Sequence, residues 1–266
     1  MKRLIFCCAA ALALIPASFA QGAAQDATLV FDPLIDGCAL ALGAGGSLGT
    51  KLALDSGASD FRSPDASELS AFDRSLSFPY SGALDRASLC VEGASLLYPA
   101  LFALIGQREE YLGAAASYAE ALLYTYAAKN CIKYFFPKAR PYAYYSSALP
   151  GELLEDADES FPSGHAALAF AAATSFAVMS LRAAGDAPAT PWLVAGAYVL
   201  AAGEGALRVA SGEHFAGDVV AGAALGAGIG YLATSLHLRP RGGPGGEEKG
   251  LSAGLSARGL VLRIAL

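Results

Sequence analysis

Residues 162–181 read PSGHAALAFAAATSFAVMSL, a long apolar run that is introduced by a proline, a serine, a glycine and a histidine. A serine directly before an apolar run is a common helix start, and about 20 apolar residues are enough to cross a bilayer. We therefore expect residues 164–181 to form a spanning helix. Ser163, Gly164 and His165 would lie at its first turn, where free backbone N–H groups suit an anion.

Other parts of the chain share this apolar character. Four more stretches of near-spanning length cover residues 87–106, 112–131, 192–207 and 215–236, and a Gly- and Ala-rich apolar run covers residues 38–54. Hydrophobic residues make up 55% of the chain and charged residues only 16%, which is too apolar for an ordinary soluble domain. The sequence predicts an all-α transmembrane helical bundle with about five to six spanning helices and an active site at one membrane face.

The chain divides into four predicted parts. Lys2 and Arg3, an apolar stretch and the small residues Ser18 and Ala20 are typical of an export signal, with an uncleaved first anchor as the alternative. The predicted parts are a signal peptide at 1–20, an N-terminal segment with one apolar helix and a polar loop at 21–86, a helical-bundle domain at 87–237, and a flexible C-terminal tail at 238–266.

Charge and cysteine content exclude several classes of protein. The net charge is −6 and no basic stripe is present outside the candidate site, so we expect no nucleic-acid partner. Cys38, Cys90 and Cys131 are odd in number and widely spaced, so we expect buried thiols and no disulfide framework. No metal-ligand spacing is visible among Cys and His, and we expect neither a metal nor another cofactor.

Three glutamates lie inside the apolar stretches, namely Glu92, Glu120 and Glu204. Ionisable groups at membrane depth are costly and face a bundle interior or a wet cavity. We expect them to hydrogen-bond between helices, with a catalytic role as the alternative.

The most specific signal is a set of three polar patches, each at the end of an apolar stretch: residues 133–141, 162–165 and 208–218. In the third patch His214 and Asp218 are four residues apart at a helix start. A carboxylate on the same helix face can hold one ring nitrogen of the imidazole and leave the other free to attack. Arg208 ends the preceding helix and can reach the same pocket.

The other two patches supply an acid and phosphate ligands. His165, in the first helical turn, can protonate a leaving group, while Ser163 can cap the helix or bind a phosphate oxygen. Lys133 is on the last turn of its helix and Arg140 follows in the loop. A lysine offers a point charge and an arginine a planar fork to phosphate oxygens.

Together the patches resemble the type 2 phosphatidic acid phosphatase and vanadium-dependent haloperoxidase superfamily, in its membrane lipid phosphatase branch. The resemblance covers about residues 87–237. It implies a metal-independent phosphatase that works through a phosphohistidine, with His214 as nucleophile, Asp218 as its orienting partner and His165 as acid. The residues that it implies as phosphate ligands are Lys133, Arg140, Ser163, Gly164 and Arg208. Leu207 departs from the family pattern, in which a serine usually precedes the arginine.

Several functions remain open at this stage. We expect an inner-membrane enzyme that removes phosphate from a phosphatidate, a phosphatidylglycerophosphate or a polyprenyl diphosphate, with its site facing the periplasm. The orientation depends on whether residues 38–54 span the membrane. The alternatives are a soluble periplasmic acid phosphatase, a vanadate-dependent haloperoxidase of the same superfamily and a non-catalytic membrane protein.

Overall fold

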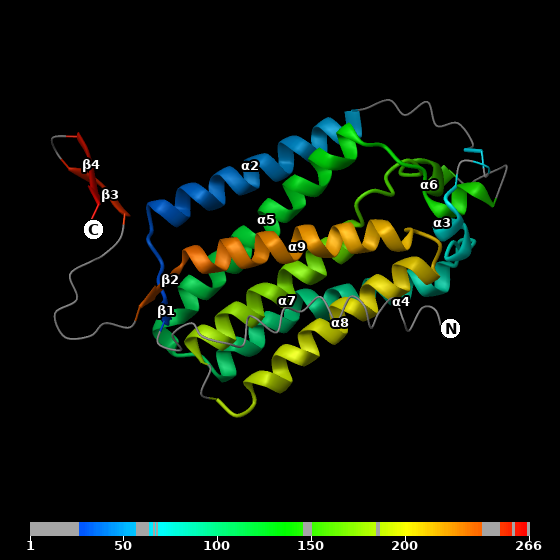
Figure 1. Cartoon of the computed structure of the whole chain (residues 1–266). Helices are drawn as coiled ribbons and strands as arrows, with labels where there is room; N and C mark the ends of the chain where they lie inside the picture. Colours follow the sequence, from blue (N-terminus) through cyan, green and yellow to red (C-terminus); the bar gives the residue numbers. More distant parts are fainter. Residues whose placement is uncertain are drawn as a thin grey trace.

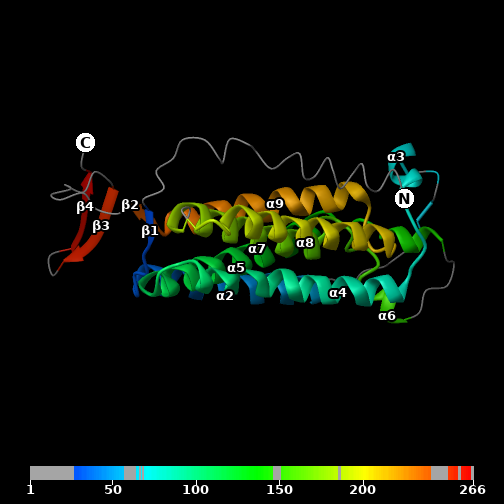
Figure 2. The ribbon, with the colours of Figure 1, turned by 90° about the horizontal axis from the view of Figure 1, so that it is seen from below.

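The computed structural model describes residues 27–56, 64, 65, 67, 69–145, 151–184, 187–240, 251–256 and 259–264, so the expected signal peptide lies outside the described residues. Six long helices dominate: α2 (Ile35–Ser56), α4 (Gly82–Leu97), α5 (Tyr111–Phe135), α7 (Gly164–Ala183), α8 (Thr190–Ala210) and α9 (Ala216–Leu236). They run roughly side by side and form an elongated bundle (Figure 1). In the view from below, α2, α4 and α5 lie on one side and α8 and α9 on the other (Figure 2). Helix α7 is the centre of the bundle, and nearly all of its side chains are buried.

Short elements connect these helices. The 3-10 helices are η3 (Tyr98–Leu104), η4 (Arg108–Glu110) and η5 (Pro141–Tyr144), and two short α-helices are α3 (Ala71–Ser75) and α6 (Gly151–Leu154). Strand β1 (Ala27–Leu29) pairs antiparallel with β2 (Leu238–Pro240), directly after α9. In the predicted tail, β3 (Leu251–Ser256) and β4 (Gly259–Ile264) form an antiparallel hairpin.

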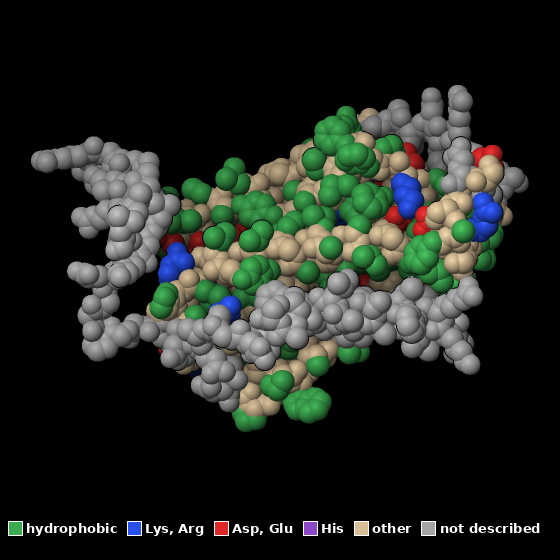
Figure 3. All heavy atoms as spheres, viewed as in Figure 1, with side chains coloured by type: hydrophobic (Ala, Val, Ile, Leu, Met, Phe, Trp, Pro, Cys, Tyr) green, Lys and Arg blue, Asp and Glu red, His purple; other side chains and the backbone are tan. Residues whose placement is uncertain are grey.

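The structure confirms the predicted fold class. Four of the described helical segments are long and apolar enough to cross a membrane, namely Gly82–Leu104, Gly164–Ala183, Thr190–Ala210 and Ala216–Leu236. Helix α5 forms where a fifth span was expected, but Glu120, Lys129 and Lys133 lower its hydropathy. The surface agrees with a membrane bundle: apolar side chains are spread over the sides of the helices, and most visible charges lie toward the two ends (Figure 3).

Helices α7 and α9 approach each other closely because glycines recur every four residues along one face of α9. A Cβ on Gly222 would lie 2.3 Å from the Ser163 carbonyl oxygen, and one on Gly226 only 1.8 Å from that of Ala167. Small residues at this spacing allow helix backbones to touch in a membrane bundle. This contact places the start of α9 directly beside the start of α7.

The prediction of buried cysteines was wrong. Cys38, Cys90 and Cys131 are exposed and free, on α2, α4 and α5 respectively. Their apolar surroundings in the sequence reflect outward-facing helix surfaces, which lipid rather than protein covers in a membrane bundle. Apolar neighbours therefore do not distinguish a buried thiol from one that faces lipid.

Candidate active site

The three polar patches meet at one end of the bundle, where α5 and α8 end and α7 and α9 begin (Figure 1). Backbone contacts join them: the Ser163 N–H donates to the Asp218 carbonyl oxygen at 3.0 Å, and the Tyr142 N–H to that of Gly212 at 3.1 Å. Gly212 has φ +78°, and a Cβ there would lie 2.5 Å from the Phe78 carbonyl oxygen. This glycine permits the sharp turn between α8 and His214.

His214 is buried and has a defined orientation. Its Nδ1 lies 2.8 Å from the carbonyl oxygen of Ser160. A carbonyl oxygen can only accept, so Nδ1 carries the proton and Nε2 keeps its lone pair. Burial, reinforced by the positive charges of Arg140 and Arg208, holds the pKa of His214 well below its usual value. The imidazole is therefore neutral at neutral pH, as a nucleophile must be.

Asp218 does not orient His214 directly, which corrects the expectation from their spacing. Its Oδ1 accepts from Lys138 Nζ at 2.7 Å, and its Oδ2 accepts from Ser160 Oγ at 2.6 Å and from the Phe215 N–H at 3.1 Å. In the described part of the chain, no hydrogen bond or ion pair links Asp218 to His214. The reason is local: α9 begins at Ala216, so His214 lies before the helix and the four-residue rule does not apply.

Ser160 replaces the direct contact. Its backbone carbonyl accepts from His214 and its hydroxyl donates to Asp218. Ser160 therefore links Asp218 to His214. Ser160 could not be recognised from the sequence, because the ability of a backbone carbonyl to accept a hydrogen bond does not depend on residue type.

Two arginines share one carboxylate at the centre of the site. Arg140 and Arg208 are both buried, and both contact Glu213, with Arg208 Nη2 3.1 Å from Glu213 Oε2. Arg140 also binds Asp156, and Arg208 also binds Asp85 and the Ser88 hydroxyl. These contacts hold both guanidinium groups in place. Glu213 was not among the predicted site residues, although its position directly before His214 could have indicated that it lies in the site.

The lysines are arranged around this pair. Lys133 Nζ donates to the Glu159 carbonyl oxygen at 2.7 Å and lies 3.3 Å from the Glu159 carboxylate. Burial, with the positive charge of Arg140 as the next cause, lowers the pKa of Lys133 to about 7. Lys138 and Lys129 were left out of the predicted site. Lys138 nevertheless binds Asp218, and a Cβ on Gly164 would lie 2.9 Å from Cδ of Lys129.

The start of α7 supplies the remaining predicted residues. Ser163 is the N-cap, and its hydroxyl accepts from the Ala166 N–H at 3.5 Å. The imidazole Nε2 of His165 lies 3.3 Å from Glu92 Oε2 on α4. Glu92 thus makes an interhelical contact, as the sequence analysis expected, but its partner is a candidate catalytic residue.

Comparison with known proteins agrees with this geometry. Residues 114–241, which include all three patches, match the PAP2 superfamily. This part of the chain is similar to the PAP2 superfamily. A stretch of 103 residues is 34% identical to a protein named lipid A 1-phosphatase from Porphyromonas gingivalis, over 39% of this chain and 19% of the relative. The chain therefore matches about a fifth of that relative's length. No solved structure matches.

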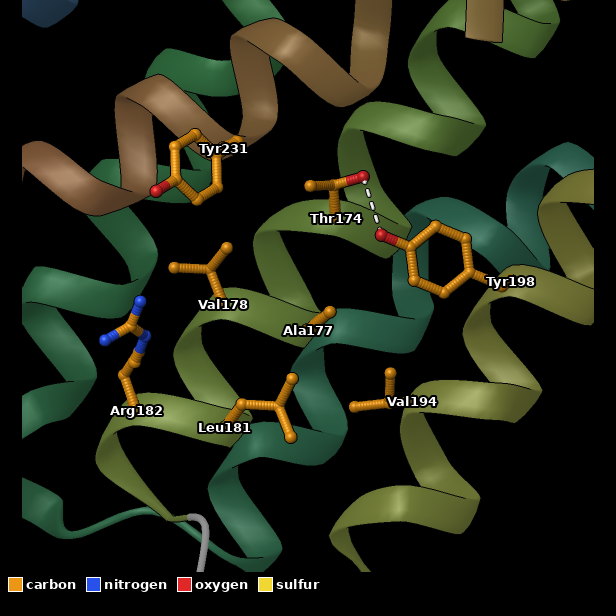
Figure 4. A pocket seen from close by; sticks show the side chains of 8 residues that line it. All are labelled: Thr174, Ala177, Val178, Leu181, Arg182, Val194, Tyr198 and Tyr231. Carbon is orange, nitrogen blue, oxygen red and sulfur yellow. Dashed lines mark hydrogen bonds between the residues drawn. The ribbon is translucent and has the colours of Figure 1, made fainter. Parts of the chain in front are cut away.

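An apolar pocket in the PAP2 region lies away from these residues. It is lined by Thr174, Ala177, Val178, Leu181 and Arg182 of α7, Val194 and Tyr198 of α8, and Tyr231 of α9 (Figure 4). Its polar contact is the 3.1 Å hydrogen bond between the Thr174 and Tyr198 hydroxyls. None of the candidate catalytic or phosphate-binding residues described above lines this pocket. The candidate active site is therefore separate from it, at the end of the bundle where α7 and α9 begin.

Proposed function

We propose that the protein is a metal-independent phosphatase that hydrolyses a lipid phosphate or diphosphate through a phosphohistidine intermediate. The observation that carries this proposal is a buried, neutral imidazole whose Nε2 is unprotonated, next to two buried arginines held by a shared carboxylate. A nucleophile with adjacent fixed cations is what phosphoryl transfer needs.

The first step is attack on phosphorus. Nε2 of His214 forms a nitrogen–phosphorus bond while the bond from phosphorus to the lipid oxygen breaks. His165, whose Nε2 lies 3.3 Å from Glu92 Oε2, donates a proton to that leaving oxygen. In the second step water attacks the phosphorus atom, and the nitrogen–phosphorus bond to Nε2 of His214 breaks. His165 accepts a proton from this water, and inorganic phosphate leaves.

Binding of the phosphoryl group draws on both arginines. Arg140 and Arg208 point donors at the Glu213 carboxylate, which occupies the position of an anion between them. Arg208 Nε is a buried donor with no hydrogen-bond partner among the described residues, so it remains free for an oxyanion. Lys133, Ser163 and the backbone at Gly164 complete the proposed set, because the N-terminus of α7 favours negative charge.

A lipid substrate follows from the position of the site. The residues lie at the ends of helices whose apolar length suits a bilayer, so a substrate with its tail in lipid can present its phosphate there. The relative's name, lipid A 1-phosphatase, refers to a phosphorylated lipid and supports this class. We propose a location in the inner membrane with the site facing the periplasm. Four apolar helices argue against the soluble alternative.

The test is phosphate release by the full chain, purified in detergent, from a panel of lipid phosphates with no added metal. The panel contains a phosphatidate, a phosphatidylglycerophosphate, a polyprenyl diphosphate and lipid A, with a water-soluble phosphate ester as comparison. We expect release from at least one lipid, faster than from the soluble ester. Quenching with an alkaline denaturant should trap a phosphoryl group on the wild-type chain, and later exposure to acid should release it.

The variant His214→Ala should lose both phosphate release and the trapped phosphoryl group while keeping a cooperative melting transition. Retained release by this variant would refute the assignment of the nucleophile. Vanadate-dependent bromide oxidation without phosphate release would instead favour the haloperoxidase alternative.

A further inference from the structure

A second polar cluster lies at the opposite end of the bundle from His214. Asp36 is in the first turn of α2, Glu120 is on α5, and His237 directly follows α9. These elements meet near β1 and β2, far along α9 from the PAP2 site (Figure 1). All three side chains are buried, with residue exposures of 6%, 4% and 5% respectively.

The atoms that face one another in this cluster lack hydrogen-bond partners. His237 Nδ1 lies 3.0 Å from the Ala233 carbonyl oxygen and must donate to it, so in the neutral ring Nε2 carries the lone pair. Both Nε2 of His237 and Oε1 of Glu120 are buried without a hydrogen bond in the described part of the chain. Asp36 uses Oδ2 to accept from the Asp32 N–H at 2.7 Å, and its Oδ1 lies on the His237 side. Unpaired buried groups of this kind are costly unless something binds them.

The distances match ligands of one small cation. Nε2 of His237 lies 3.4 Å from Asp36 Oδ1 and 3.6 Å from Glu120 Oε1, and the three ligand atoms all lie within 4.8 Å of one another. These separations are too long for good hydrogen bonds. Tetrahedral coordination with bonds of about 2.0–2.2 Å places neighbouring ligands roughly 3.3–3.6 Å apart.

We propose that Asp36, Glu120 and His237 bind a divalent transition metal, with Zn²⁺ as the ion that the ligand set fits best. Two carboxylates and a neutral imidazole leave a charge of −2, which a dication neutralises, and no Lys or Arg pairs with either carboxylate among residues that the structure describes. The imidazole favours Zn²⁺ over Mg²⁺ or Ca²⁺, which prefer oxygen ligands. The contact from Nδ1 to a backbone carbonyl is the usual outer-shell support of a metal-binding histidine.

The role of this metal is structural. It joins α2, α5 and the end of α9, and the Val30 N–H donates to the His237 carbonyl oxygen at 3.0 Å beside it. Elsewhere α2 packs along α5 and also forms hydrogen bonds with it, from Ser47 Oγ to the Leu123 carbonyl oxygen and from the Tyr124 hydroxyl to that of Ala39. The proposal does not depend on the phosphatase function, since the cluster shares no residue with that site.

The test uses the full chain in detergent, stripped of metal with a strong chelator and then titrated with Zn²⁺. We expect one equivalent to bind and to raise Tm by about 5–10 °C at saturating metal. Glu120→Gln and His237→Gln should weaken binding by more than about 100-fold, because even outer-shell partners change metal affinity by 10- to 100-fold. Asp55→Asn is the matched control, since Asp55 is an exposed carboxylate on the same α2 helix.

A second measurement on the unaltered chain covers the case in which the variants do not fold. Co²⁺ bound to the stripped protein should give the intense visible absorption of a tetrahedral site, and one equivalent of Zn²⁺ should abolish it. The proposal is overturned if the wild-type chain binds no stoichiometric metal, if Co²⁺ shows only its hydrated spectrum, or if folded Glu120→Gln binds Zn²⁺ as tightly as Asp55→Asn.

Discussion

The two ends of α9 each present a buried histidine, and the two rings are held in the same way. His214 donates from Nδ1 to the Ser160 carbonyl oxygen, and His237 donates from Nδ1 to that of Ala233, so Nε2 is the free nitrogen in both. Their neighbours differ in charge. His214 lies among Arg140 and Arg208, whereas Asp36 and Glu120 surround His237.

This difference shows that the tautomer of a histidine does not decide its role. At the first end, fixed cations attract an anion, so the free nitrogen can attack phosphorus. At the second end, two carboxylates attract a cation, so the same nitrogen can serve as a ligand. The sign of the surrounding charge separates a proposed nucleophile from a proposed metal ligand.

The largest effect is expected from a change in the close contact between α7 and α9, because both ends of the bundle depend on it. In Gly226→Ala the new Cβ would lie 1.8 Å from the Ala167 carbonyl oxygen, which forces α9 away from α7. We expect destabilisation by about 3 kcal/mol or more, with phosphate release and metal binding lost together. Gly228→Ala is the control, because nothing lies within 4 Å of its Cβ. Thermal melting in detergent checks this, and equal Tm values for the two variants would contradict it.

Removal of the Arg208 guanidinium should impair only the candidate active site around His214. We expect Arg208→Ala to lower kcat/KM for the lipid phosphate by about 100- to 1000-fold, as is typical for loss of one transition-state donor. Zn²⁺ affinity at the other end should not change. Arg182→Ala is the matched variant, since Arg182 lines the apolar pocket and not the PAP2 site. An Arg208→Ala enzyme as active as Arg182→Ala would remove Arg208 from phosphate binding.

A smaller effect is expected where Asp218 acts through Ser160. Because the Ser160 hydroxyl donates to Asp218 and its carbonyl holds His214, Ser160→Ala and Asp218→Asn should each lower kcat about tenfold, which is ~1.4 kcal/mol. KM should stay near the wild-type value. The double variant should lose no more than either single one, and full additivity of the two losses would show that the residues act separately.

The smallest effect is expected in the pH dependence of kcat/KM, which depends on His214 and Lys133. The lowered pKa of His214 keeps the nucleophile neutral, so the acid limb of kcat/KM should lie below pH 6.5. Lys133 binds phosphate when protonated and has a pKa of about 7, so kcat/KM should fall as pH rises past 7. Lys133→Arg should move this alkaline limb upward, because arginine stays charged. An unchanged alkaline limb would exclude Lys133 as its cause.

The lowered pKa of His214 also affects the stability of the folded protein. His214 is held neutral in the folded state, while in the unfolded chain it takes up a proton below its ordinary pKa of 6.5. The unfolded state therefore binds more protons at low pH, and the contribution of His214 to stability is lost as pH falls below 6.5. Melting temperatures between pH 5 and 8 measure this effect, and His214→Ala should flatten the dependence.

The sequence by itself determined the helices and supplied most of the candidate phosphate-binding and catalytic residues. Long apolar runs interrupted by polar turns predict spanning helices, because a bilayer requires length and hydropathy that can be read along the chain. Lys133, Arg140, His165, Arg208 and His214 could be named because their residue types and order carry the chemistry. The structure brings residues from all three patches into mutual contact.

Only the tertiary structure decided which groups touch. The Ser160 carbonyl, the shared carboxylate of Glu213 and the cluster of Asp36, Glu120 and His237 join residues that are distant in the chain or act through the backbone. Spacing along a helix suggested a contact between His214 and Asp218, but the helix starts too late for it. Residue type and order are local properties, whereas a hydrogen bond or a shared cation depends on how closely α7, α9 and their neighbours approach.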